Sequence, residues 1–152
     1  MESKYNDKII LWSKIATVFF IILVVLADIF GVTSARYIAT EWAGMSDDFS
    51  VGAFTTVYYL ITVLAYIVLI CVLKLLNNMS KDVVFDKKNT DLIKYVVICL
   101  IVAGFAFFGL AFVWGEAGVL SLVAWFVSLI VLSVKVAFDK AITMKKDIDL
   151  TI

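Results

Sequence analysis

The chain has no proline and no histidine among its 152 residues, and it has only two cysteines. Without histidine, two cysteines make a poor ligand set for zinc. The sequence also lacks a glycine-rich phosphate loop and any recognisable catalytic set. Without proline or glycine-interrupted spans, the broken helices common in secondary transporters are not visible. We therefore expect a protein that is not an enzyme and that uses neither a cofactor nor a metal.

Charged residues are also scarce, at 17% of the chain, whereas hydrophobic residues make up 64%. A soluble domain is nearer half apolar and a quarter charged. The formal net charge is zero, which gives no indication of direct binding to nucleic acid. This composition is typical of a membrane protein.

Four apolar segments are each long enough to cross a bilayer, which takes roughly 20 residues. They predict spanning helices over residues 9–32, 53–76, 92–114 and 117–138. Helices satisfy their own backbone hydrogen bonds, which lipid cannot do for them. We therefore predict a single-domain, all-α membrane protein over residues 1–152. Its four transmembrane helices form an up-down bundle, and residues 139–152 form a tail.

Lysine is distributed unevenly along this pattern. The N-terminal side, the loop between the second and third spans, and the C-terminal side together hold twelve lysines, whereas the opposite face holds only Arg36. Positive residues concentrate on the cytoplasmic side of membrane proteins, so both termini and that loop are predicted to be cytoplasmic. The first apolar segment exceeds the roughly 7–15 residues of a signal peptide core, so we expect it to remain as a helix. The sequence leaves homo-oligomerisation open.

The two outer connections differ in length. Residues 33–52 form the longer one, in which the spacing of Ile38 and Trp42 suits one face of a short interfacial helix. Residues 115–118 form a minimal one, so the third and fourth spans must make a tight antiparallel hairpin. Small residues along both spans, such as Gly104, favour close helix packing.

A polar pocket is predicted at the outer ends of the spans. Asp28 lies within an apolar segment, where a carboxylate costs several kcal/mol unless it is paired, hydrated or protonated. Polar residues of the second span and the outer loops complete the candidate pocket, which consists of Asp28, Arg36, Tyr59, Thr62 and Glu116. In the alternative interpretation, Asp28 lies at the water interface and simply pairs with Arg36.

The stretch NNMSKDVVFDKKNT, residues 77–90, is the longest run that is not mostly apolar. Ser80 and Asp86 are good helix caps, and Asp86 is expected to start the helix that leads into the third span. The lysines of the stretch would reach anionic headgroups while residues 83–85 press against the membrane surface. An anchored loop and a protein-binding surface are the two interpretations.

At this loop the sequence resembles the YoaS-like proteins, a bacterial four-helix membrane family of unknown function. Within LKLLNNMSKDVVFDKKNTDLIKY, Phe85, Asp86 and Asn89 match the family's Phe, its capping residue and its Asn. The closing segment FDKAITMKKDIDLTI is similar to the family's acidic-polar tail. Its last residues correspond to a Leu-Thr-Ile-like ending, and they are Asp149, Leu150, Thr151 and Ile152.

The resemblance implies the four-helix topology and a place in the bacterial inner membrane. Members are often encoded beside a small Cro-like helix-turn-helix regulator, which implies a membrane partner for a DNA-binding protein. The leading hypothesis is a non-enzymatic regulatory or sensor protein that binds this partner through the matched cytoplasmic residues. Two alternatives stay open: immunity or tolerance towards a membrane-active peptide, and a small ion or solute carrier that uses Asp28.

Overall fold

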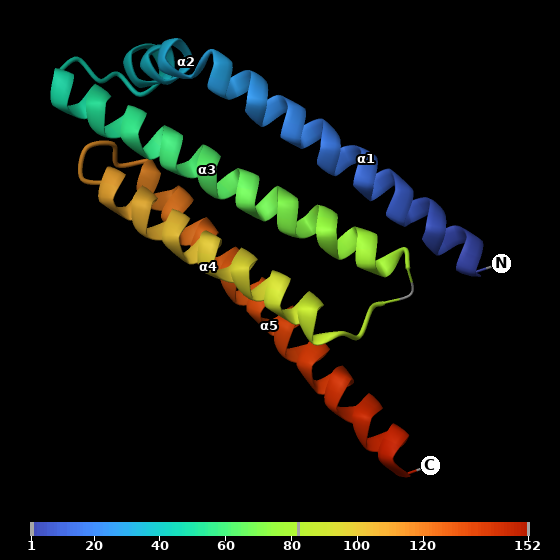
Figure 1. Ribbon diagram of the computed structural model, residues 1–152. Helices are drawn as coiled ribbons and strands as arrows, with labels where there is room; N and C mark the ends of the chain where they lie inside the picture. Colours follow the sequence, from blue (N-terminus) through green and yellow to red (C-terminus); the bar gives the residue numbers. More distant parts are fainter. Residues whose placement is uncertain (1, 82, 152) are drawn as a thin grey trace.

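The computed structural model of the protein describes residues 2–81 and 83–151, apart from the side chains of residues 2–6 and 149. Every regular element in that part of the chain is a helix. Four helices are long: α1 (Glu2–Ile29), α3 (Asp48–Met79), α4 (Lys87–Leu110) and α5 (Ala117–Thr151). Between α1 and α3 lie the short helix α2 (Gly31–Tyr37) and the π-helical segment η1 (Ile38–Trp42) (Figure 1).

The four long helices each contain an apolar segment long enough to cross a bilayer. Large apolar side chains are exposed along all of them, for example Phe19 on α1 and Phe126 on α5. Such exposure suits a lipid environment, because lipid tails are as apolar as these side chains. The prediction of an all-α membrane protein with four spanning helices is confirmed.

The helix ends differ from the predicted spans, because hydropathy reports the apolar segment and not where the helical hydrogen bonds stop. Helix α4 begins at Lys87, since the side chain of Asp86 accepts a 2.8 Å hydrogen bond from the Lys88 backbone N–H. The predicted capping role of Asp86 is confirmed, whereas Ser80 lies at the C-terminal end of α3. Helix α5 continues past residue 138 to Thr151. Its 35 residues span about 52 Å, compared with a hydrocarbon core of about 30 Å.

Helices α4 and α5 form the predicted antiparallel hairpin, joined by a short turn over residues 111–116. Gly104 of α4 faces the indole of Trp125 so closely that a Cβ atom there would overlap the ring. The rings of Phe105 and Phe108 flank the same indole, with centroids 5.2 and 5.9 Å from it. The absence of a side chain at Gly104 therefore allows this pair of helices to pack.

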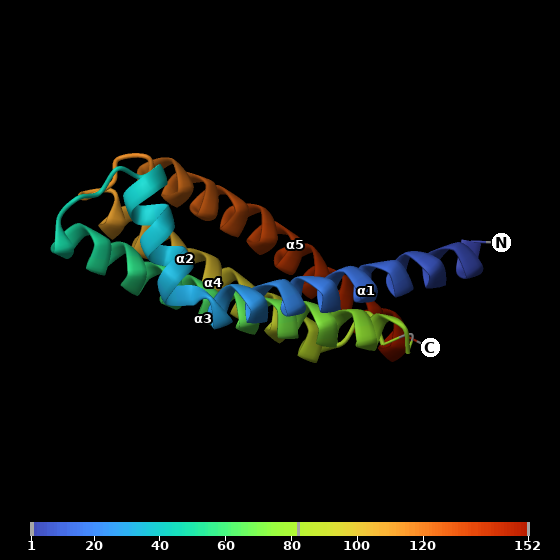
Figure 2. The ribbon, with the colours of Figure 1, turned by 90° about the horizontal axis from the view of Figure 1, so that it is seen from above.

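Helix α1 packs against α3 but not against α4 or α5 within the described part of the chain. Figure 2 shows α1 lying over α3, with α5 to one side. The hydroxyl of Tyr58 donates a 3.0 Å hydrogen bond to the carbonyl of Ala27, and the ring of Tyr59 occupies the space that a Gly31 side chain would need. The α1–α2 unit is therefore joined to the remaining helices mainly along one face of α3.

An apolar cluster closes the end of the molecule opposite the termini. It contains buried residues from η1, α3, α4, α5 and the chain before α3, namely Ala39, Met45, Phe54, Leu110 and Ala117. The predicted short helix around Ile38 and Trp42 is present as η1. Gly44 follows η1 and has a φ of 65°. Glycine suits this position, because other residues rarely adopt this backbone conformation.

Candidate functional site

We call the end of the molecule where α3 ends and α4 begins the lysine-rich end. Asn89 is the most buried polar residue there, with no exposed surface. Its side-chain oxygen accepts a 2.6 Å hydrogen bond from the amide of Asn78, the penultimate residue of α3. Its own amide donates to the carbonyls of Val83 and Val84, at 2.7 and 2.8 Å. One side chain thus fixes the end of α3, the loop and the first turn of α4 together.

Phe85, in the same loop, contacts α5. Its ring centroid lies 5.9 Å from that of Phe138, although half of the Phe85 side chain stays exposed. The loop between α3 and α4 and the distal part of α5, which are far apart in sequence, therefore form one continuous surface. We call this surface the loop–α5 surface; it consists of residues 83–86 and the part of α5 from Phe138 onwards.

An ion pair lies beside this contact. The ammonium group of Lys135 is paired with the carboxylate of Asp139, one turn later on α5. Thr90, buried in the first turn of α4, lies next to the same carboxylate, and its hydroxyl donates to the carbonyl of Lys87 at 2.9 Å. These polar groups lie where the start of α4 packs against α5, and each of the two bonds stays within one helix.

The closing residues that carry the family resemblance lie at the free end of α5. Leu150 is 85% exposed, and the Thr151 hydroxyl donates a 2.6 Å hydrogen bond to the carbonyl of Asp147. The side chain of Asp149 and the whole of Ile152 lie outside the described residues. In Figure 1 this end of α5 projects beyond the first turn of α4.

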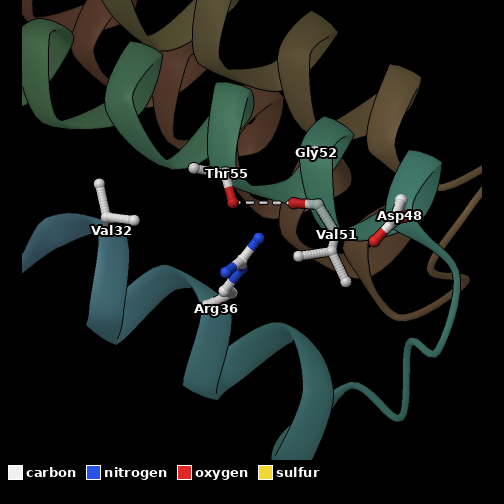
Figure 3. A pocket seen from close by; sticks show the side chains of 6 residues that line it. All are labelled: Val32, Arg36, Asp48, Val51, Gly52 and Thr55. Carbon is white, nitrogen blue, oxygen red and sulfur yellow. Dashed lines mark hydrogen bonds between the residues drawn. The ribbon is translucent and has the colours of Figure 1, made fainter.

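At the opposite end, Arg36 lines a cavity of about 510 Å³ between α2 and the start of α3 (Figure 3). Its guanidinium group points toward Thr55, whose hydroxyl donates a 2.8 Å hydrogen bond to the carbonyl of Val51. Asp48 lies on the same cavity. The cavity therefore carries one cationic and one acidic side chain at its rim.

The other four residues of the predicted outer pocket do not line this cavity. Tyr59 packs against Gly31, and Thr62 lines a separate, apolar cavity of about 250 Å³ that α3, α4 and α5 share. Glu116 is exposed in the turn between α4 and α5. The five predicted residues therefore do not line one pocket, because they come from α1, α2, α3 and the turn before α5, and Tyr59 and Thr62 of α3 have different neighbours.

Asp28 faces α3 rather than Arg36. Its Oδ1 atom is buried and has no hydrogen-bond partner among the described residues, and its carboxylate lies near the hydroxyl groups of Tyr66 and Tyr58. The alternative prediction of an Asp28–Arg36 ion pair is not met in the structure, because the two side chains form no such contact.

Comparison with known proteins identifies the family. The model of the DUF2975 family, described as a protein of unknown function, matches residues 18–152. The chain belongs to this family. The DUF2975 match includes the loop–α5 surface, and the predicted membership of a family of unknown function is confirmed. No curated protein and no solved structure matches the chain significantly.

Sequence reasoning missed Asn78, Phe138 and the pair of Lys135 with Asp139. The spacing of Lys135 and Asp139, four residues apart on a helix, is a signal that could have found the ion pair. Nothing local in the sequence indicates that Asn78 meets Asn89 or that Phe85 meets Phe138, because both contacts depend on how the helices pack.

Proposed function

We propose that this protein is a non-enzymatic membrane regulator that binds a small cytoplasmic helix-turn-helix DNA-binding protein on its loop–α5 surface. The contact between Phe85 and Phe138 is the observation that carries the proposal. It joins the two segments of the family resemblance into one surface, which the lysine distribution predicts to be cytoplasmic.

The end of α5 offers the chemistry that such a partner needs. Met144 and Ile148 are about 60% exposed, lie four residues apart and therefore share one face of the helix. Beyond the membrane these side chains would meet water, which makes an apolar face costly to leave uncovered. A groove on a small helical protein could cover them, as in other complexes where a helix lies in a groove.

A regulator also needs a route from the membrane to this surface. The ammonium group of Lys14 on α1 donates a 2.8 Å hydrogen bond to the Ser80 hydroxyl, where the loop begins. Movement of α1 along α3 would therefore pull on the segment that Asn78 and Asn89 hold in place. A signal acts through this route only if it binds two arrangements of the helices with different affinity.

Co-purification from mild detergent tests the proposal. A small DNA-binding protein should accompany the wild type and Phe49→Ala, an exposed phenylalanine at the opposite end of the molecule, but not Phe85→Ala or a chain that lacks residues 147–152. Equal recovery of the DNA-binding protein with all four chains, or none with the wild type, would count against the proposal.

A second candidate function rests on a different observation, the buried Oδ1 atom of Asp28, which faces α3 and has no hydrogen-bond partner in the described part of the chain. A carboxylate at such a place in a membrane protein is typical of proton or cation pathways. Cation flux into liposomes should then fall with Asp28→Asn and stay unchanged with the exposed control Asp48→Asn. Identical flux for the wild type and Asp28→Asn would exclude a carrier of this kind.

A further inference from the structure

A second cavity lies at the lysine-rich end, on the side of the α3–α4 pair where the helices meet the loop. It has a volume of about 380 Å³ and is lined by Lys74, Asn77, Asn78, Lys88 and Leu92. The first three residues belong to the last turns of α3, and the other two to the first turns of α4. The cavity is therefore built by two helices whose relative position Asn78 and Asn89 fix.

Two cations meet at this cavity without a carboxylate partner. The described residues contain one ion pair, between Lys135 and Asp139, so neither Lys74 nor Lys88 is neutralised by a neighbour at close range. The nearest acidic side chain in sequence, Asp86, accepts a hydrogen bond from the backbone of Lys88 as the cap of α4. Two ammonium groups on opposite walls favour an anion between them.

The side-chain amides of Asn77 and Asn78 differ in their hydrogen bonding. Asn78 donates its amide to Asn89 and so forms a fixed part of the wall. The exposed Asn77 makes no side-chain hydrogen bond with the described residues, although its backbone carbonyl accepts one from the Ser80 hydroxyl at 2.9 Å. The Asn77 amide is therefore free to donate to an oxygen atom in the cavity. Ammonium and amide donors together suit the oxygens of a phosphate group.

The lining residues lie at two depths along the helices. Lys74 lies one turn deeper along α3 than Asn78, and Leu92 lies one turn deeper along α4 than Lys88, which is about 6 Å in each case. The deeper level therefore carries Lys74 and the apolar Leu92, whereas the mouth at the end of the helices carries Asn78 and Lys88. A phospholipid suits this arrangement, because its phosphate can lie among the polar side chains while its apolar part lies against Leu92. Basic pockets between helix ends are known to bind lipid headgroups.

We propose that this cavity binds the phosphate of an anionic phospholipid from the leaflet that borders the lysine-rich end. Lys74 and Lys88 hold the phosphate from two sides, Asn77 donates to it, and Leu92 contacts the apolar part of the lipid. The site is separate from the loop–α5 surface and does not depend on the proposed DNA-binding partner.

The melting temperature of the purified full-length protein in detergent tests the site. Added phosphatidylglycerol should raise it for the wild type, and phosphatidylcholine should not. The double variant Lys74→Gln, Lys88→Gln should need about thirtyfold more phosphatidylglycerol for the same rise, because each of the two lysines near a headgroup contributes roughly one kcal/mol, or about fivefold in affinity. The charge-matched control Lys145→Gln, Lys146→Gln, on the exposed end of α5, should respond as the wild type does.

A further variant guards against a change in folding. Lys74→Arg, Lys88→Arg keeps both charges and should retain most of the preference for phosphatidylglycerol. The assignment is overturned if Lys74→Gln, Lys88→Gln responds to phosphatidylglycerol like the wild type. It is also overturned if inorganic phosphate alone protects the wild type equally well, because the site would then belong to a soluble phosphate and not to a lipid.

Discussion

The side chains of Asn78 and Asn89 join two consecutive membrane helices through a 2.6 Å hydrogen bond at the point where the chain leaves α3 and enters α4. Asn89 is fully buried and also binds two loop carbonyls, so the connection is a structured part of the protein and not a loose link. The cavity with Lys74 and Lys88 lies on one side of this pair. The contact of Phe85 with α5 lies in the same loop.

Replacing Asn89 should therefore destabilise the whole lysine-rich end. Asn89→Ala removes three hydrogen bonds and takes this partner away from the carbonyls of Val83 and Val84 and from the Asn78 amide. We expect the free energy of unfolding to fall by about 2–3 kcal/mol. Hydrogen exchange should become faster at residues 83–90. Asn77→Ala, an exposed neighbour, is the control and should change neither quantity noticeably; equal loss in both variants would contradict the role of Asn89.

The packing of α4 against α5 gives a prediction with a control on the same helix. Gly104→Ala places a methyl group into the indole of Trp125, whereas Gly109→Ala meets nothing within 4 Å. Overpacking typically costs about 1–3 kcal/mol, so Gly104→Ala should lower the melting temperature. Gly109→Ala should leave it unchanged or raise it, because alanine favours a helix. A melting temperature for Gly104→Ala that matches Gly109→Ala would show that the two helices are not this close.

The start of α3 should respond to pH through its capping residue. Asp47 accepts hydrogen bonds from the backbone N–H and the hydroxyl of Ser50, and these bonds lower the pKa of its carboxyl below its ordinary value of 3.8. The folded state therefore binds this proton less readily than the unfolded state. Its stabilising contribution is complete above pH 3.8 and is lost as the pH falls through the lowered pKa.

Hydrogen exchange of the Ser50 amide measures this contribution. Asp47→Ala should speed exchange at neutral pH, and the difference from the wild type should disappear in strong acid. Asp48→Ala, which removes the next carboxylate along the chain but not the cap, should have a smaller effect. A difference between Asp47→Ala and the wild type that persists unchanged in strong acid would argue against a carboxylate cap.

The orientation of the protein in the membrane can be measured with single cysteines in a chain that lacks Cys71 and Cys99. Both residues are buried, so their replacement by alanine removes no surface group. In spheroplasts, a membrane-impermeant maleimide should label Thr40→Cys on η1 but label Lys146→Cys on α5 only after the membrane is opened. Labelling of Lys146→Cys in intact spheroplasts would reverse the predicted topology.

The number and kind of spanning helices could be predicted from the sequence, because each span needs a long apolar segment and each segment is visible. The cap at Asp86 could be predicted as well, since capping is a local property of a few residues. The extension of α5 to Thr151 could not, because hydropathy says nothing about a polar helix that continues into water. The partners of Asn89 and Phe85 depend on side-chain contacts between separate helices.

The outer residues illustrate the same limit. The predicted outer pocket includes Asp28, Arg36 and Glu116 because these residues lie at a similar depth in the predicted spans or the adjoining outer loops. Depth along a helix follows from sequence position, but the direction of a side chain relative to the neighbouring helices does not. Asp28 faces the tyrosines of α3, whereas Arg36 faces a cavity beside the start of that helix. A polar residue in an apolar span can thus be recognised from sequence, but its partner cannot.

The most direct test of the proposed function is site-specific photo-crosslinking in growing cells, with the crosslinker placed at Met144 of α5 or, as the control, at Phe112 in the turn after α4. Both side chains are exposed, at opposite ends of the molecule. The proposal predicts a covalent adduct with a small helix-turn-helix protein at Met144 and none at Phe112. No such adduct at Met144, or the same adduct at both positions, would contradict the proposal that the loop–α5 surface holds a DNA-binding partner.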